Sequence, residues 1–205
     1  MELVYNSREE RAEYIWKKYG EFLPGSVLDV GCGNAHLRKY IANNYTGVDF
    51  TGNPDIRIDL EQGELPFTDN SFYSVVCTDV LEHLENIHKI VWELVRVSKR
   101  YVIISLPNNW TSIFEYILTG KANLHYYGLP LEKPIDRHKW FFNYEDANNF
   151  IYGLAKKMDM DVIVCEPYHG PKGRTLKKIL PAVANNSNRV NNAIAMALWA
   201  VLEKK

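Results

Sequence analysis

The stretch from Val27 to Leu37, VLDVGCGNAHL, constrains the fold of this chain more than any other segment. A short apolar strand runs into a Gly-x-Gly turn, and a helix is expected to follow. Gly31 and Gly33 permit positive φ angles and let the backbone approach a ligand closely. The start of a helix adds unpaired N–H groups and partial positive charge. The segment therefore predicts a strand–turn–helix unit with a ligand held at the turn.

Short apolar strands alternate with helices along most of the chain. We predict strands at 26–30, 45–49, 56–59, 72–78, 101–106 and 160–166, and helices at 7–19, 36–43, 87–98, 144–158 and 175–183. The last apolar segment, 193–202, is predicted as a strand or a helix. Runs of buried residue types such as 72–78 suit parallel strands covered on both faces. This alternation is typical of an α/β sheet with right-handed crossovers.

The first predicted helix carries both a start signal and a buried face. Ser7 is a plausible N-cap, and Glu10 three positions later completes a capping-box pattern. Helical spacing then places four residues on one face that we expect to be buried: Ala12, Ile15, Trp16 and Tyr19.

Composition places the chain among ordinary soluble globular proteins. Its 205 residues carry 24 Lys and Arg against 25 Asp and Glu, and 46% of them are hydrophobic. At roughly 150 residues per domain, this length predicts one domain over residues 1–205. The net charge of −1 argues against a basic nucleic-acid-binding protein. The apolar run at 193–202 falls short of the ~20 residues that a membrane span needs.

The three cysteines, Cys32, Cys77 and Cys165, are widely spaced and form no CxxC pair. An odd number of thiols beside apolar neighbours fits reduced cysteines in a cytosolic protein. The charged N-terminal segment lacks the apolar stretch of a signal peptide. We therefore expect a cytoplasmic protein with neither a disulfide framework nor a zinc ribbon.

An acidic residue distinguishes the glycine turn from a dinucleotide site. Asp29 lies two residues before Gly31, and the third glycine of a G-x-G-x-x-G fingerprint would fall on His36. A carboxylate at this position would crowd a pyrophosphate, but it could hold a cation. The Asp-x-Gly-x-Gly pattern resembles the glycine-rich motif of class I S-adenosylmethionine-dependent methyltransferases. In that family the acid helps to position the amino-acid end of the cofactor, and Ala35 stands where the family has its third small residue.

The resemblance extends to about residue 106. Asp49 ends the second predicted strand, where an acid can accept hydrogen bonds from ribose hydroxyls, and Asp59 ends the third, where the family's acid accepts from adenine. Residues 65–84, LPFTDNSFYSVVCTDVLEHL, resemble the family's fourth-strand signature, although Tyr73 stands where Asp is usual. The resemblance implies S-adenosylmethionine as cofactor, S-adenosylhomocysteine as product, and these cofactor-binding residues: Asp29, Gly31, Cys32, Gly33, Asp49, Phe50, Asp59, Leu60 and Thr78.

The same resemblance implies a fold. The family has a Rossmann-like α/β domain whose seven-stranded, mostly parallel sheet is sandwiched by helices, with the last strand antiparallel. Residues 160–166 and 193–202 would supply its last two strands. After Pro107 the alternation of strands and helices breaks, and residues 108–142 are predicted as a lid with one helix at 112–119. We expect this insertion after the fifth strand to recognise the acceptor.

The acceptor is expected to lie between this lid and the first helix. Residues 136–141, DRHKWF, are similar to a run in ubiquinone-pathway O-methyltransferases and related small-molecule enzymes. His138 is the candidate catalytic base, because imidazole titrates near neutrality, although it could equally anchor the lid. His83, Arg137 and Trp140 are candidate substrate residues, and for His83 a structural or cofactor-adjacent role is favoured over that of a base.

Two further groups of residues have more than one interpretation. Aromatic side chains in the lid could form a pocket for a planar or apolar acceptor, or a small core of the lid itself: Trp110, Phe114, Tyr116, Tyr126, Tyr127, Trp140, Phe141 and Phe142.

A metal site is not predicted. Asp79, Glu82, Glu85 and His88 could suggest one, but neighbouring residues at a strand-to-helix junction point in different directions.

The sequence therefore predicts a methyltransferase that uses S-adenosylmethionine on a small-molecule or lipid-like acceptor. Transfer to oxygen or nitrogen would be direct and in line, with the protein supplying orientation. One alternative is a non-catalytic binding or partner subunit with the same fold. A nicotinamide-dependent oxidoreductase is a less favoured alternative. Neither a nucleic-acid partner nor a membrane span is expected, and the sequence leaves the oligomeric state open.

Overall fold

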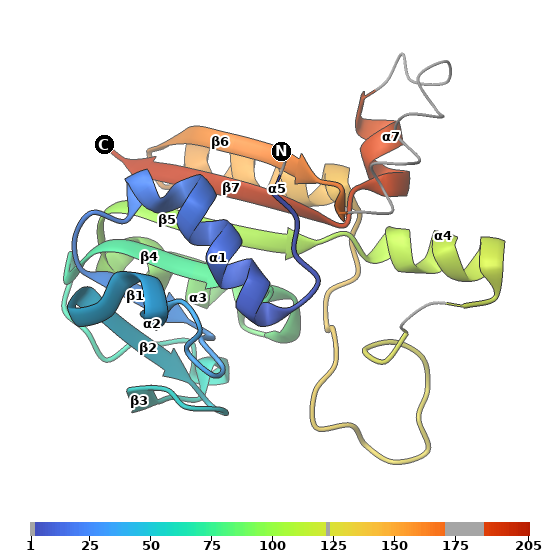
Figure 1. Cartoon of the computed structure of the whole chain (residues 1–205), viewed down its shortest axis with the longest axis horizontal. Helices are drawn as coiled ribbons and strands as arrows, with labels where there is room; N and C mark the ends of the chain where they lie inside the picture. The colour runs from blue at the N-terminus through green and yellow to red at the C-terminus, as the bar shows by residue number, and fades with distance from the viewer. Residues whose placement is uncertain (1–2, 122–123, 171–186) are drawn as a thin grey trace.

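The computed structural model describes residues 3–121, 124–170 and 187–205. Its strands form one seven-stranded sheet in the order β3-β2-β1-β4-β5-β7-β6 (Figure 1). The pairs from β3 to β5 are all parallel, whereas β7 is antiparallel to both of its neighbours, β5 and β6. This is the seven-stranded, mostly parallel, Rossmann-like sheet that the sequence predicts.

The strands are β1 (Val27–Val30), β2 (Tyr45–Asp49), β3 (Ile56–Arg57), β4 (Phe72–Thr78), β5 (Ser98–Pro107), β6 (Met160–Tyr168) and β7 (Ala197–Lys204). The α-helices are α1 (Arg8–Tyr19), α2 (Arg38–Ile41), α3 (Ile87–Val97), α4 (Asn109–Thr119), α5 (Tyr144–Lys157) and α7 (Ser187–Ile194). Short 3₁₀ helices are η1 (Gly20–Phe22), η2 (Ala42–Asn44), η3 (Leu60–Gln62) and η4 (Leu81–His83).

Helices cover both faces of the sheet (Figure 1). On one face α1 packs its buried residues against Val27, Val76 and Trp199 of three different strands. On the other face α3 and α5 bury Leu94 and Ile151 against the same strands. Each fully buried Leu or Ile contributes about 1.5–3 kcal/mol. The two apolar layers hold the central strands rigidly, so the strand ends are fixed points on which a site can be built.

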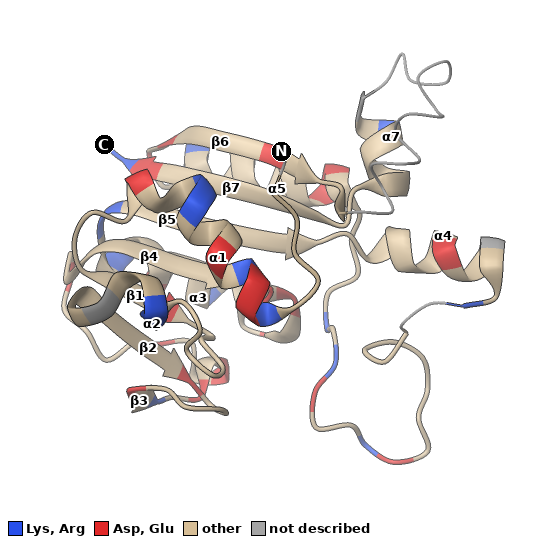
Figure 2. Ribbon diagram, in the orientation of Figure 1, with Lys and Arg blue, Asp and Glu red and all other residues tan. Residues whose placement is uncertain are grey.

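Helix α1 begins at the predicted cap, but Glu10 has a different partner. The Ser7 hydroxyl accepts the N–H of Glu10 at 3.1 Å. The Glu10 carboxylate accepts the N–H of Asn6, rather than that of Ser7 as in a capping box. Acidic and basic residues alternate along α1 in Figure 2, and Lys17 pairs with Glu13 one turn away. Such pairs suit a helix face that is turned to solvent.

The prediction of which residues of α1 are buried is wrong for Trp16. Trp16 is 40% exposed and stacks on Tyr40, with ring centroids 6.3 Å apart. Tyr14 is buried instead, because it inserts among the rings of Tyr5 and Trp199. The helix therefore rests on the sheet through a face rotated towards Tyr14.

Several element boundaries differ from the prediction. The helix expected at 36–43 is reduced to α2, because Ala35 has a φ of 55° in a turn that delays the helix. The strand expected at 56–59 ends at Arg57, since Asp59 caps η3 instead of pairing. Conversely, β5 continues to Pro107, because β7 pairs with it along its whole second half.

The C-terminal part of the chain combines both predicted alternatives. Residues 193–202 include the end of α7 and most of β7, so the segment is helix and then strand. β6 continues two residues beyond the predicted end at Glu166, paired with β7 up to Tyr168. The helix predicted at 175–183 lies outside the described residues.

The segment after β5 leaves the sheet as α4, which projects from the body of the molecule (Figure 1). Asn108 caps this helix by accepting the N–H of Trp110 at 3.2 Å, so α4 begins three residues before the predicted helix at 112–119. The described aromatics of 108–142 form neither one pocket nor one core. Four of them are exposed: Trp110, Phe114, Tyr116 and Phe141. Two contact the ring of His138, namely Tyr126 and Tyr127. The remaining two, Trp140 and Phe142, pack against the main core.

Trp199 provides a test of which face of α1 is buried. It is fully buried and contacts the rings of Tyr5, Tyr14 and Tyr19. We predict that Trp199→Ala lowers the free energy of unfolding by about 3–5 kcal/mol, because the truncation leaves a large cavity. Trp16→Ala is the matched control and should cost less than about 1 kcal/mol. Urea denaturation measures both, and equal losses in the two variants would contradict this assignment.

Candidate active site

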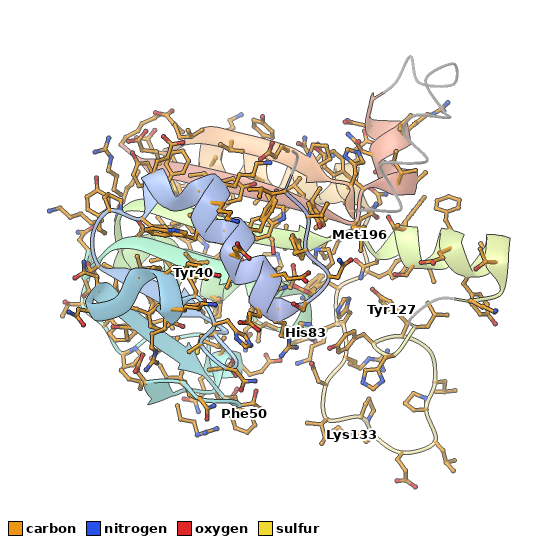
Figure 3. All side chains as sticks on the ribbon, in the orientation of Figure 1. Tyr40, Phe50, His83, Tyr127, Lys133 and Met196 are labelled. Atoms are coloured by element: carbon orange, nitrogen blue, oxygen red, sulfur yellow. The ribbon has the colours of Figure 1, made fainter. Side chains whose placement is uncertain are left out.

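A cavity of about 400 Å³ opens at the carboxyl ends of β1, β2 and β4. The chain order reverses between β1 and β4 in the sheet, and ligands in open α/β sheets bind at such switch points. In Figure 3, Phe50 lies on the β2 side of this region and His83 on the side of residues 108–142. All nine predicted cofactor-binding residues line the cavity: Asp29, Gly31, Cys32, Gly33, Asp49, Phe50, Asp59, Leu60 and Thr78.

The Gly-x-Gly turn is packed too closely for a side chain at its first glycine. Gly31 has a φ of 76°, and a Cβ there would lie 2.1 Å from a methyl carbon of Val80. Its N–H donates to the carbonyl oxygen of Val48 at 2.8 Å. The N–H of Gly33 donates to the carboxylate of Asp49 at 2.8 Å. The turn is therefore fixed against β2 on one side and against the loop after β4 on the other.

Asp49 and Asp59 are held by backbone groups at the cavity wall. Asp49 Oδ1 accepts the N–H and the hydroxyl of Thr51 at 2.7 and 3.2 Å. Asp59 Oδ1 accepts the N–H of Glu61 at 3.0 Å as the cap of η3. A carboxylate offers about four lone-pair directions, so both groups retain capacity for hydroxyl or amino donors. Phe50, 61% exposed, offers a flat apolar surface beside them.

Asp29 is a buried carboxylate that faces the cavity. The hydroxyl of Tyr45 donates to it at 2.7 Å. Burial raises the pKa of Asp29 to about 6, while the Tyr45 hydrogen bond and the nearby charge of Arg11 lower the pKa and Asp49 raises it further. The Tyr45 hydrogen bond and the charge of Arg11 thus offset only part of the cost of burying the ionised carboxylate. It is therefore suited to pair with a cationic group of a ligand.

Helix α1 borders the cavity, as the sequence analysis expects, but the residues that it contributes were not predicted. Arg8 and Arg11 line the cavity, and the Arg11 guanidinium pairs with Asp79, which follows β4. Ser105 donates its hydroxyl to the other oxygen of Asp79 at 2.6 Å. Asp79 has a φ of 52°, so these two partners fix a strained turn. The pairing of Arg11 with Asp79 could not be predicted from sequence spacing, because the two residues are far apart in the chain and meet only in the folded structure.

A second group of polar side chains lies beside the cavity, formed by Glu82, His83 and His138. Glu82 is 1% exposed, and its Oε2 has no hydrogen-bond partner among the described residues. Burial, and next the charge of Asp79, raise the pKa of Glu82 well above its usual range. Burial lowers the pKa of His138 to about 4, so its imidazole is neutral at pH 7.

The remaining predicted substrate residues lie in different places. His83 lines the cavity, and its Nδ1 is 2.7 Å from the carboxylate of Asp136, which also lines it. Arg137 is exposed and lies outside the cavity wall. Trp140 donates its indole N–H to the carbonyl oxygen of Leu84 at 2.7 Å and packs against the core. The predicted run 136–141 thus reaches the cavity through Asp136 and Lys139.

Comparisons with known proteins agree with this geometry. Residues 28–105 match the family model described as a methyltransferase domain. The match includes the Gly-x-Gly turn and both strands that flank it. Over residues 28–105 the chain is similar to the class I S-adenosylmethionine-dependent methyltransferase family. S-adenosylmethionine is the cofactor of this family.

One curated relative is the ubiquinone biosynthesis O-methyltransferase of Rickettsia typhi, 26% identical over 142 residues. The match takes in 60% of this chain and 55% of the relative, so the chain spans little more than half of that protein. In the part of the chain that the structure describes, there is no helix long and apolar enough to cross a membrane.

Solved structures share the fold. The small RNA methyltransferase HEN1 matches with a TM-score of 0.62 at 16% identity, over 100% of this chain and 26% of that one. Magnesium protoporphyrin IX methyltransferase from Synechocystis PCC 6803, solved with bound S-adenosylhomocysteine, matches with a TM-score of 0.54 at 16% identity. That match covers 96% of this chain and 83% of the other. At such identities the likeness is one of fold alone.

The residues at the cavity fit the family's cofactor. Asp29 would offer a buried, partly compensated carboxylate to the cofactor's amino group. Asp49 already accepts three hydrogen bonds and would offer its remaining lone-pair direction to a ribose hydroxyl. Gly31 and Gly33 line the cavity with backbone atoms alone, so no side chain from either residue enters it. Asp29 and Asp49 would hold the two polar parts of the molecule, and Phe50 would contact its planar base.

Asp49→Ala tests the ribose site. We predict that affinity for S-adenosylhomocysteine falls about tenfold or more, because hydrogen bonds to a charged acceptor are worth about 1.5–3 kcal/mol. Asp55→Ala is the matched control, since Asp55 also accepts a backbone N–H, that of Gly47 at 2.7 Å, but lies outside the cavity wall. Calorimetric titration measures both variants, and unchanged affinity in Asp49→Ala would remove the assignment.

Asp29 should make cofactor binding depend on pH. Its pKa of about 6 means that the carboxylate is ionised at pH 8 but mostly protonated at pH 5. Pairing with a cofactor ammonium needs the ionised form, so affinity for S-adenosylhomocysteine should fall about tenfold from pH 8 to pH 5. In Asp29→Asn the affinity should be weak and nearly independent of pH over this range. A wild-type affinity that stays constant would exclude this pairing.

Proposed function

We propose that this chain transfers the methyl group of S-adenosylmethionine to an oxygen or nitrogen atom of a small-molecule or lipid-like acceptor. The observation that supports it most directly is the two-ended cavity. Acidic side chains at successive strand ends line one end, and His83, Asp136 and Lys139 line the other. A donor held by the acidic side chains would leave the part of the cavity beside His83, Asp136 and Lys139 for an acceptor.

The residues of the chain contribute orientation and exclusion of water. Bound S-adenosylmethionine supplies an electrophilic methyl group, and its transfer leaves S-adenosylhomocysteine. The Arg11–Asp79 ion pair ties α1 to the residue after β4, and both side chains line the cavity. Holding two reactants in line can supply about 7–11 kcal/mol of the barrier reduction. The carboxylates of Asp29, Asp49 and Asp59 bind and take no part in bond making.

His138 is better suited to positioning than to accepting a proton. Its pKa of about 4 makes the neutral imidazole a weak base. Tyr126 stacks on its ring at 4.7 Å between centroids, and its Nδ1 lies 3.0 Å from the Tyr127 hydroxyl. These contacts support the second of the two roles predicted from sequence, an anchor for residues 108–142.

Two observations support an apolar or lipid-like acceptor. Leu129, Leu131 and Ile135 are fully exposed in the loop that borders the second end of the cavity, and Ile135 lines the cavity itself. The curated relative is named as an O-methyltransferase of ubiquinone biosynthesis, which makes an oxygen acceptor the first candidate. We therefore assign residues 108–142 to acceptor recognition, within one methyltransferase domain over residues 1–205.

The first experiment compares ligands by thermal unfolding. S-adenosylmethionine or S-adenosylhomocysteine at a hundred times its dissociation constant should stabilise the fold by about 2.7 kcal/mol. For a chain of this size the melting temperature should rise by roughly 5–10 °C. NAD is the matched control and should cause no shift, because the Asp29 carboxylate at the Gly-x-Gly turn would crowd and repel its pyrophosphate. A shift with NAD alone would overturn the proposal in favour of an oxidoreductase.

Activity then separates catalysis from binding. Methyl transfer from labelled S-adenosylmethionine is measured with phenols, simple amines and prenylated quinols as acceptors. We expect product from at least one oxygen acceptor. Cofactor binding with no transfer to any acceptor class would instead support the non-catalytic binding subunit.

A further inference from the structure

We propose that Glu82, His83 and His138 form a binding site for one divalent transition-metal ion at the edge of the cofactor cavity. Each side chain offers one ligand atom, and the three atoms lie within 4.8 Å of one another. Glu82 and His83 are adjacent in η4, whereas His138 comes from the loop before α5. The sequence analysis predicted no metal site because it weighed only residues 79–88, and His138 lies outside that segment.

The distances suit a common ion. His83 Nε2 lies 3.6 Å and His138 Nε2 lies 3.9 Å from the same oxygen of Glu82. Ligand atoms at 2.0–2.2 Å from a shared ion lie about 3–3.6 Å apart at bond angles near 90–110°. The three groups are thus within a few tenths of an ångström to about 1 Å of a ligating arrangement, which small side-chain rotations supply.

The cluster lacks a good hydrogen-bonding arrangement of its own. Separations of 3.6 and 3.9 Å are too long for hydrogen bonds between these groups. Glu82 Oε2 has no partner in the described part of the chain, although the side chain is almost fully buried. An unpaired buried carboxyl costs about 1–3 kcal/mol or more. A cation between Glu82 Oε1 and the two Nε2 atoms would offset the charge of this buried carboxylate.

The other nitrogen of each imidazole is already engaged. His83 Nδ1 lies 2.7 Å from Asp136, so its proton is donated to a carboxylate and Nε2 keeps its lone pair. Near His138 Nδ1 lie the Tyr127 oxygen at 3.0 Å and the Asn109 amide nitrogen at 2.8 Å. The Asn109 amide donates to Nδ1, so without an ion the ring proton lies on Nε2, which faces Glu82. Binding of an ion at Nε2 moves that proton to Nδ1, where Tyr127 accepts it once the Asn109 amide turns away. Ligating histidines are commonly oriented by such partners.

Backbone hydrogen bonds hold the two halves of the cluster together without an ion. The N–H groups of Lys139 and Trp140 donate to the carbonyl oxygen of Glu82 at 2.8 and 3.3 Å. Trp140 adds its indole N–H on Leu84 at 2.7 Å. Lys139 also pairs with Glu61, on the cavity wall. A metal ion would therefore bind to a largely preformed site rather than assemble it.

The ligand set indicates the class of metal. Two imidazoles and one carboxylate suit first-row ions such as Mn²⁺, Fe²⁺, Co²⁺ and Zn²⁺. Mg²⁺ and Ca²⁺ prefer oxygen ligands throughout. With three protein ligands, coordination positions remain open, and His83 places them beside the cavity.

The role of the ion rests on the proposed function. An acceptor hydroxyl bound at an open position would release its proton to solvent more readily. Its oxygen would then form the bond to the methyl carbon while the carbon–sulfur bond breaks, with the electron pair staying on sulfur. The acceptor class would be one whose reactive oxygen can also ligate a metal.

Metal binding is measured on the full chain after treatment with a chelator, which is then removed. The loss of the free Mn²⁺ signal in electron paramagnetic resonance gives stoichiometry and affinity. We expect one bound Mn²⁺ per chain, and at least tenfold weaker binding in both Glu82→Gln and His138→Asn. His88→Asn, at an exposed histidine of α3 outside the cluster, is the matched control and should bind like the wild type. Thermal unfolding in EDTA verifies that each variant is folded.

A second probe identifies the ligands without variants. Co²⁺ bound to nitrogen and oxygen gives visible absorption without the strong near-ultraviolet band of thiolate ligation. A thiolate band would assign the ion to a cysteine such as Cys32 and overturn the proposal. So would the absence of Mn²⁺ binding up to 1 mM, or equal binding in wild type, Glu82→Gln and His138→Asn.

Cofactor binding is measured separately, with S-adenosylhomocysteine in EDTA. Binding of the cofactor with no metal site would overturn this inference and leave the proposed function intact. Binding of one Mn²⁺ by the cluster without any binding of the cofactor would do the opposite. The two failures are therefore distinguishable.

Discussion

The parallel pairing of β1 with both β2 and β4 determines where the polar groups of this protein meet. Because all three strands point the same way, Asp29, Asp49 and Thr78 arrive at one edge of the sheet. The apolar layers on both faces prevent these strand ends from moving apart. The close contact between Gly31 and Val80 then seals the turn after β1 against the loop after β4. Substitution of that glycine would displace both sides of the cavity together.

Two buried carboxyl groups, those of Asp29 and Glu82, dominate the electrostatics of the site. Asp29 lines the cavity, and Glu82 lies beside it. Burial disfavours the ionised form of each, so a cationic group bound beside either carboxylate would stabilise that form. Arg11 compensates the region only in part, since Asp79 already occupies its guanidinium. The fold therefore carries an electrostatic cost that ligand binding can recover.

Local patterns in the sequence were sufficient for the central sheet and for one end of the site. The strand run 72–78, the Gly-x-Gly turn and the acids at strand ends are short-range signals, and the structure brings those residues to one cavity. The pairing of Arg11 with Asp79 and of His138 with Glu82 could not be predicted in this way, because each joins segments more than fifty residues apart. Trp16 and Tyr14 show a related limit, since periodicity alone cannot say which of two neighbouring aromatics enters the core.

The attachment of residues 138–140 to Glu82 and Leu84 divides the segment 108–142 into two parts with different freedom to change. The attached part is fixed by backbone and indole hydrogen bonds to the loop after β4. The part that includes α4 and residues 129–135 exposes large apolar side chains and carries little of the core. If this segment recognises the acceptor as proposed, substitutions there would change acceptor choice and leave the carboxylates at the strand ends in place. Proteins with this arrangement can thus change the exposed part of the segment at low cost in stability. The hydrogen bonds of residues 138–140 keep that part attached to the loop after β4.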